Sequence, residues 1–114
     1  MIATRLKLSN IIAIVDANNL QGYDSVENIQ QVSTFKKKWD AFGWNVQEVD
    51  GHDVKQLKNA LKLESLQTDY PTVLIAHTIK GRGISEMEGV LGWHYYSVTK
   101  EKLPVFLKEL EENA

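Results

Sequence analysis

One short segment, residues 11–15 (Ile-Ile-Ala-Ile-Val), constrains the fold more than any other part of the sequence. Every residue in it is apolar, and it ends at Asp16. A continuous β-branched run predicts a strand buried on both faces, because a half-buried strand would alternate apolar and polar residues. Such strands are typical of parallel sheets covered by helices, so this run predicts an α/β fold.

The other predicted elements alternate along the chain as such a fold requires. After residues 11–15 they are a helix at 34–42, a strand at 44–49, a helix at 54–63, a strand at 72–76 and a helix at 99–112. Ser33 and Asp53 are the expected N-caps of the first two helices. Pro104 lies in the first turns of the last helix, where proline is tolerated. The order favours a mostly parallel sheet with flanking helices in one domain, residues 1–114.

Three strands make a thin sheet, and the chain opens on what resembles the end of a helix. Residues 2–8 have the pattern of a helix tail that already packs on a sheet. Sheets usually contain more than three strands. We therefore expect the fold to be partial, with another strand and most of a helix upstream or supplied by another chain.

Composition excludes several classes of function. A formal net charge of -2 gives no basic surface for nucleic acid. The chain has no Cys, which excludes disulfides and thiolate metal sites. The longest apolar run, residues 11–15, is far too short to span a bilayer, and the first ten residues lack a signal-peptide pattern. A cytoplasmic protein that binds no membrane is the default expectation.

Two segments follow buried strands and should meet at the ligand-binding edge of the sheet. In residues 16–22, the side chains of Asp16, Asn18 and Asn19 offer the oxygen ligands that Mg²⁺ prefers. The same Asn-Asn pair more often forms a turn. In residues 77–83, two cations lie beside glycines and could hold a phosphate. The glycine spacing fits neither a P-loop nor the dinucleotide fingerprint, and an ordinary basic loop is the commoner case.

The histidines allow two interpretations each. His52 lies in a turn before a predicted helix, where a role in turn geometry is favoured over chemistry. His94 follows Trp93 among aromatic residues, which more often indicates packing than catalysis. The three His residues have no metal-ligand spacing, and no Gly-x-Ser-x-Gly segment supports a hydrolase.

Seven short segments, taken in order, resemble the N-terminal, thiamine-diphosphate-binding domain of transketolases, specifically its C-terminal portion. They are Lys7-Leu8-Ser9-Asn10, Ile12-Ala13-Ile14-Val15-Asp16-Ala17-Asn18-Asn19-Leu20-Gln21, Lys38-Trp39-Asp40-Ala41-Phe42-Gly43-Trp44, Val49-Asp50-Gly51-His52-Asp53, Pro71-Thr72-Val73, His77-Thr78-Ile79-Lys80-Gly81-Arg82-Gly83 and Trp93-His94. The resemblance covers nearly the whole chain.

The resemblance implies a cofactor, a metal and a reaction. Thiamine diphosphate would bind between two domains, with Mg²⁺ anchoring its diphosphate, and a two-carbon ketol unit would move between sugar phosphates. The family's metal ligands fall on the side chain of Asn18 and the backbone carbonyl of Leu20. His94 matches a family His near the cofactor diphosphate and the substrate, so it is the candidate for catalysis and cofactor binding. The residue after that His is usually Gly, and here it is Tyr95.

The departures from the family imply that the chain is incomplete as an enzyme. No Gly-Asp-Gly segment occurs, so the aspartate ligand of the metal is absent, as is the domain that binds the aminopyrimidine. We expect neither cofactor to bind tightly to this chain alone. The expected partners are the remaining transketolase domains or a second subunit, in a homo-oligomer such as a dimer. The alternative is a non-catalytic α/β interaction or assembly module derived from the same scaffold.

Overall fold

The computed structural model describes residues 1–66 and 68–113, which form two compact units. The first, the sheet unit, comprises Met1–Ala17 and Gln31–Thr78. The second, the loop unit, comprises Asn18–Gln30 and Ile79–Ala114. The two segments of the loop unit therefore follow the first and last strands of the sheet unit along the chain.

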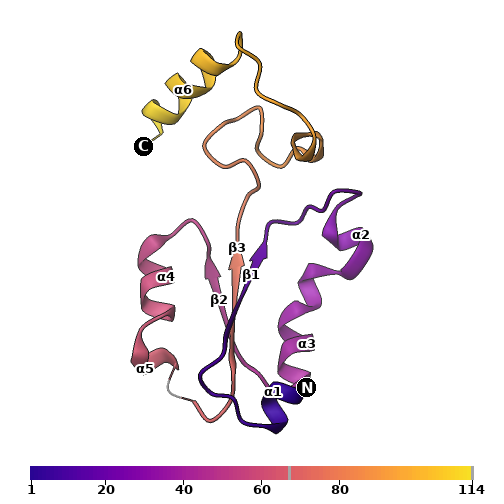
Figure 1. The fold of residues 1–114 in the computed structure, drawn as a ribbon, viewed down its shortest axis with the longest axis vertical. Coiled ribbons are helices and arrows are strands. Elements are labelled where there is room, and N and C mark those ends of the chain that lie inside the picture. The colour runs from indigo at the N-terminus through magenta and orange to yellow at the C-terminus, as the bar shows by residue number, and fades with distance from the viewer. Residues whose placement is uncertain (67, 114) are drawn as a thin grey trace. The chain divides into compact units, whose positions relative to one another are not determined.

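The sheet unit contains a parallel three-stranded sheet, as the sequence predicts (Figure 1). Its strands are β1 (Ile12–Ala17), β2 (Asn45–Asp50) and β3 (Thr72–His77), in the order β1-β3-β2. The register pairs Ile12 and Asn45 with Thr72, so all three strands run in step to the same edge. The fold is thus α/β.

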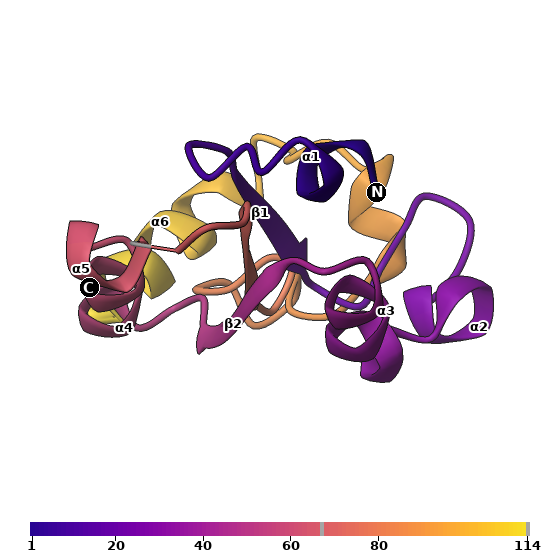
Figure 2. The same cartoon turned by 90° about the horizontal axis from the view of Figure 1, so that it is seen from below.

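Helices cover both faces of this sheet. Seen from below, α4 (Val54–Ala60) and α5 (Leu63–Leu66) lie on one side and α3 (Phe35–Ala41) lies on the other (Figure 2). The short α1 (Ile2–Arg5) precedes β1 and lies within the helix tail predicted at residues 2–8, but it ends three residues earlier. Asp53 caps α4 as predicted, because its carboxylate accepts from the backbone N–H groups of Lys55 and Gln56.

Two predicted helix starts are wrong. A 3-10 turn, η1 (Val32–Thr34), precedes α3, so the α-helix begins at Phe35 and its N-cap is Thr34 rather than Ser33. The last helix, α6 (Leu103–Glu112), begins at Leu103 rather than Thr99, with Pro104 in its first turn. Proline lacks an N–H donor and fits the first turn, where that N–H would have no helical partner. The position of Pro104 thus agrees with the later start.

The buried centre of the sheet is β3, not β1. Residues 72–76 are all buried, whereas Ile12 and Ile14 on β1 are 43% and 60% exposed. The prediction of a strand buried on both faces at residues 11–15 is therefore wrong within the described residues. The reason is position: β3 has neighbours on both sides, and β1 lies at an edge of this sheet.

The loop unit has little regular structure. Its helices are α2 (Val26–Gln30), the 3-10 turn η2 (Leu91–His94) and α6. Phe106 of α6 is 4% exposed and packs edge-to-face on the Trp93 ring, with ring centres 5.8 Å apart. The carboxylate of Glu109 accepts from Ser85 N–H, which joins α6 to the preceding loop. None of the described helices is long and apolar enough to cross a membrane.

Candidate functional site

The carboxyl ends of β1 and β3 lie side by side within the sheet unit. Asp16 pairs with Ala76 and Ala17 with His77 in the strand register. The Thr78 hydroxyl donates to the Asp16 carboxylate across these two strand ends. Gly51 N–H donates to the His77 carbonyl at 2.7 Å, which brings the turn after β2 to the same edge. Ligands of parallel α/β sheets bind at this edge.

Asn18 begins the loop that follows β1, and its side chain shapes a turn. Its amide oxygen Oδ1 accepts from Leu20 N–H at 3.0 Å, which is an Asx-turn. Asn19 between them has a left-handed backbone with φ 64°, a conformation that Asn tolerates better than most residues. The common interpretation of the Asn-Asn pair, a turn, is therefore confirmed. An amide oxygen has two lone pairs, so this bond uses one acceptor position.

Leu20 pairs with Ser25 in an isolated antiparallel bridge. The bridge is held by hydrogen bonds from Gln21 N–H to the Asp24 carbonyl and from Val26 N–H to the Asn19 carbonyl. In this non-hydrogen-bonded type of pair, the backbone groups of Leu20 itself point away from the opposite segment. The Leu20 carbonyl oxygen thus takes no part in closing the loop.

The far side of this loop leads into α2, which the sequence prediction missed. Ser25 Oγ accepts from Asn28 N–H at 3.3 Å, an N-cap contact. Hydrogen bonds from the Asn28 side chain and from Ser25 N–H lower the pKa of the Asp24 carboxyl. The signal was present as Asp24-Ser25 before Val26, but a five-residue helix is too short to show an apolar period.

His94 and Tyr95 close η2. The His94 side chain is exposed, and its ring centre is 6.2 Å from that of Tyr95. The Tyr95 hydroxyl donates to the Gly22 carbonyl at 2.6 Å. The residue next to His94 is therefore bonded to the loop that carries Asn18 and Leu20. Sequence reasoning named Tyr95 only as a departure from the family, and no local pattern indicated its contact with residue 22.

The basic loop at residues 79–83 already has an anionic partner. Glu88 accepts from Gly83 N–H at 3.1 Å and lies 3.8 Å from Arg82 Nε. Gly81 has φ 80°, and a side chain there would collide with Met87. A carboxylate of the chain is thus already bonded to this loop, at a backbone N–H and beside the Arg82 guanidinium. This geometry favours the ordinary-loop interpretation over phosphate binding.

His52 lies in the turn after β2, as predicted. Its backbone N–H donates to the Asp50 carboxylate at 2.8 Å. Gln56 Oε1 in turn accepts from Asp50 N–H at 3.1 Å, so the turn is tied to α4. The position of His52 thus supports turn geometry.

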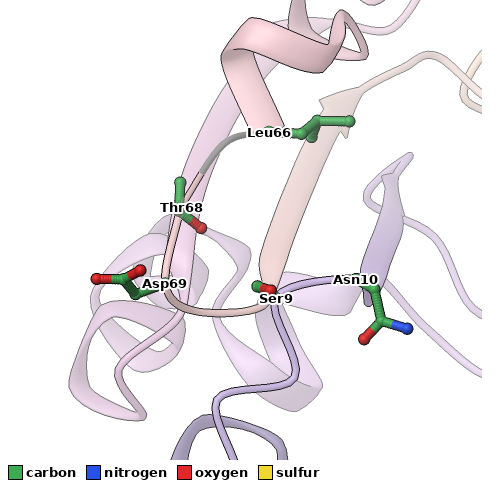
Figure 3. Close-up of a pocket in the computed structure, with 5 residues that line it drawn as sticks. All are labelled: Ser9, Asn10, Leu66, Thr68 and Asp69. Carbon is green, nitrogen blue, oxygen red and sulfur yellow. The ribbon is translucent and has the colours of Figure 1, made fainter.

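A hollow of about 690 Å³ lies at the opposite end of the sheet unit (Figure 3). Ser9 and Asn10 line it from the segment before β1, and Thr68 and Asp69 from the segment before β3. These are the amino ends of the strands, whereas ligands of such sheets bind at the carboxyl ends. The hollow is not the candidate site.

The oxygen donors fit part of a magnesium site. Asn18 supplies an amide oxygen and Leu20 a backbone carbonyl, and Mg²⁺ prefers oxygen ligands that it shares with water and phosphate. Among residues 1–66 and 68–113, no three His, Cys, Asp or Glu side chains cluster closely enough to hold a metal ion. Mg²⁺ sites normally include an anionic ligand as well, which the diphosphate or a further carboxylate would supply here.

Comparisons with known proteins identify the family of this chain. The family model "Transketolase, thiamine diphosphate binding domain" matches residues 1–109. One subunit of the apulose-4-phosphate transketolase of Phocaeicola vulgatus is 33% identical over 98% of this chain and 40% of its own length. A 6-deoxy-6-sulfo-D-fructose transketolase subunit of a Clostridium species is 33% identical over 98% of this chain and 41% of its own length.

A solved structure gives the same result. Transketolase from Campylobacter jejuni superposes with a TM-score of 0.81 at 27% identity, covering 98% of this chain and 17% of that one. The chain therefore spans less than half the length of each of these relatives. The match nevertheless extends over nearly all of the 114 residues, and the chain belongs to the transketolase family as part of its thiamine-diphosphate-binding domain.

Proposed function

We propose that this chain supplies part of the cofactor site of a transketolase-like enzyme, which transfers a two-carbon ketol unit between sugar phosphates. The observation that best supports this proposal is the geometry of the loop after β1. Its Asx-turn fixes the Asn18 amide, and its bridge leaves the Leu20 carbonyl outside the pairing. Two oxygen donors two residues apart are thus presented by one loop of a family domain that binds thiamine diphosphate.

In this proposal Asn18 and the Leu20 carbonyl are neutral ligands of Mg²⁺, and the metal neutralises the cofactor diphosphate. Thiamine diphosphate, when bound, supplies the carbanion chemistry that breaks and forms the carbon–carbon bond. The chain's own task is to hold the diphosphate end in place. Productive orientation of this kind supplies a large part of the barrier reduction in many enzymes.

His94 is the proposed catalytic and cofactor-binding residue. It is exposed at the end of η2, beside the residue that bonds the Asn18 loop. An imidazole there can donate a hydrogen bond to a diphosphate oxygen or to a substrate hydroxyl. The proposed role of His94 is to orient the substrate and the diphosphate.

The proposed enzyme needs further polypeptide. Two relatives are named as subunits of transketolases, one for apulose 4-phosphate and one for 6-deoxy-6-sulfo-D-fructose. We propose that the remaining transketolase domains, or a second subunit, complete the site in a homo-oligomeric assembly. The substrate is accordingly an anionic ketose, a sugar phosphate or a close analogue.

Substitutions at Asn18 test the metal assignment in the assembled enzyme. Asn18→Ala removes the amide ligand and should weaken Mg²⁺ binding at least tenfold, as measured by calorimetric titration in the presence of thiamine diphosphate. Asn18→Asp keeps an oxygen ligand and should retain binding. Asn19→Gly is the matched control, because Gly accepts the positive φ of residue 19 and only the neighbouring amide is lost.

His94→Ala, in the same assembly, should raise KM for the sugar phosphate, or should raise the concentration of thiamine diphosphate that the enzyme requires for activity. The affinity for Mg²⁺ should be nearly unchanged. Unchanged Mg²⁺ affinity in Asn18→Ala would sink the metal assignment. Unchanged kinetics in His94→Ala would remove His94 from the site.

A further inference from the structure

Tyr95 is a surface residue, yet it makes a specific hydrogen bond to a distant part of the chain. Its side chain is 69% exposed, so it is not a core residue. Its hydroxyl nevertheless donates to the Gly22 carbonyl at 2.6 Å, across 73 positions in the sequence. Its neighbours Trp93 and Tyr96 pack on each other with ring centres 5.6 Å apart. The packing of η2 thus uses Trp93 and Tyr96, whereas Tyr95 reaches the loop after β1.

Gly22 and Tyr95 are fitted to each other. A Cβ added at residue 22 would lie 2.9 Å from the Tyr95 oxygen and 3.9 Å from the ring carbon that carries it. The first distance is too short for a carbon–oxygen contact, and the second is an ordinary one. Any larger residue at position 22 would therefore push the hydroxyl away from the carbonyl, and glycine avoids this.

The hydrogen bond between Tyr95 and Gly22 also ties the loop to a distant segment of the chain, which the loop's own local interactions do not do. The Asx-turn at Asn18 and the hydrogen bonds of the bridge between Leu20 and Ser25 join residues that are at most seven positions apart. They set the shape of the loop. A bond from Gly22 to Tyr95 fixes the loop relative to η2, which also carries His94.

We propose that Tyr95 is a positioning residue for the cofactor site: its hydroxyl holds the Gly22 carbonyl and so fixes the loop that presents Asn18 and the Leu20 carbonyl. This inference rests on the proposed magnesium role of that loop. The bond acts on the metal through the backbone, two residues from Leu20, and Tyr95 itself touches neither metal nor cofactor.

The test compares Tyr95→Phe with Tyr96→Phe in the assembled enzyme. Each variant loses one phenolic hydroxyl, and Tyr95→Phe removes the bond to Gly22. A neutral hydrogen bond contributes about 1 kcal/mol, so Tyr95→Phe should weaken Mg²⁺ binding about three- to tenfold in calorimetric titration. Hydrogen exchange of the metal-free enzyme should show faster exchange at the amides of Leu20, Gln21 and Val26. Tyr96→Phe should change neither quantity.

Gly22→Ala provides a second, coupled measurement. In the parent enzyme it should weaken Mg²⁺ binding as Tyr95→Phe does, because the added methyl displaces the hydroxyl. In the Tyr95→Phe background it should add little, because the nearest remaining ring carbon is at an ordinary contact distance. Strong non-additivity of the two changes is therefore the expected result.

Asn18→Ala separates failure of this inference from failure of the proposed function. If Asn18→Ala abolishes Mg²⁺ binding while Tyr95→Phe leaves binding or amide exchange unchanged, the metal site stands and the positioning role of Tyr95 is overturned. If Asn18→Ala leaves Mg²⁺ binding unchanged, both are overturned. Additive effects of Gly22→Ala and Tyr95→Phe would also overturn the positioning role.

Discussion

Gly51 lies where the turn after β2 meets the end of β3, and the space there admits no side chain. A Cβ at residue 51 would overlap the Thr78 methyl group and lie 3.1 Å from the His77 carbonyl oxygen. Gly51→Ala should therefore displace Thr78 and its hydrogen bond to Asp16. We expect a loss of about 1–3 kcal/mol in the free energy of unfolding, measured by denaturant titration.

Thr78→Ser tests whether the Thr78 methyl is the obstacle to Gly51→Ala. Serine keeps the hydroxyl that bonds Asp16 and lacks the methyl group, so it should restore part of the stability lost in Gly51→Ala. Residue 51 is not among the glycines with a positive φ, so backbone conformation does not oppose an alanine there and the cost is expected to come from the contacts of the added carbon. If Thr78→Ser gives no rescue, the Thr78 methyl group is not the main obstacle to a side chain at residue 51.

Asp53 should make the stability of the sheet unit depend on pH. Hydrogen bonds from the Gln56 backbone and side chain, and then from Lys55 N–H, lower the pKa of the Asp53 carboxyl below its usual 3.8. A lowered pKa means that the stabilisation is complete above 3.8 and is lost as the pH falls through the folded-state value. Asp53→Ala should thus lower Tm by a few degrees at pH 7, and the difference from the parent should shrink below pH 4.

Asp69→Ala serves as the reference for Asp53→Ala, because Asp69 is also an exposed aspartate but lies outside the helices. Its effect on Tm should be smaller at pH 7. A difference between parent and Asp53→Ala that grows as the pH falls would contradict the assigned role of Asp53.

At the level of single residues, the sequence predicts local geometry and misses distant contacts. The turn at Asn18-Asn19 and the cap at Asp53 depend on neighbours within three positions, which the sequence displays. The bond from Tyr95 to Gly22 depends on how the chain returns after β3. The magnesium role proposed for Asn18 rests on the resemblance to transketolases, since the residues alone favoured a turn.

At the level of elements, composition identified the strands but not their places in the sheet. Residues 11–15 and 72–76 are both apolar runs, and each became a parallel strand. Order in the sheet then decided burial, because β3 lies between β1 and β2. A run of β-branched residues does not show whether it has strands on both sides in the sheet. The prediction that β1 is buried on both faces therefore failed, whereas the same kind of run is buried in β3.

The positions of β3 and β1 predict that replacing a large side chain by alanine lowers the free energy of unfolding more in β3 than in β1. Leu74 is 1% exposed, so Leu74→Ala should lower the free energy of unfolding by roughly 2–5 kcal/mol through lost burial and a cavity. Ile14 is mostly exposed, and Ile14→Ala should cost less than about 1 kcal/mol in this chain alone. Denaturant titration of both variants measures the difference. Equal costs would show that β1 is covered by something outside the described residues.

At the level of the whole molecule, both of the metal ligands proposed for this chain are neutral oxygen atoms. The loop after β1 offers one amide oxygen and one carbonyl oxygen, and the described residues contain no cluster of acidic or histidine side chains suited to a metal. The matched relatives are more than twice as long. These facts agree with the expectation that other domains or a second subunit contribute the charged part of the site.

The 114-residue chain alone should therefore show no saturable binding of thiamine diphosphate and Mg²⁺ at micromolar concentrations in a calorimetric titration. Two neutral oxygens give too little charge compensation for a diphosphate and its metal, since hard cations in such sites normally have carboxylate ligands as well. Addition of the polypeptide that carries the remaining transketolase domains should produce binding, and Asn18→Ala in that mixture should abolish it. Micromolar binding by the chain alone, lost when Mg²⁺ is omitted, would show that its own residues complete the site.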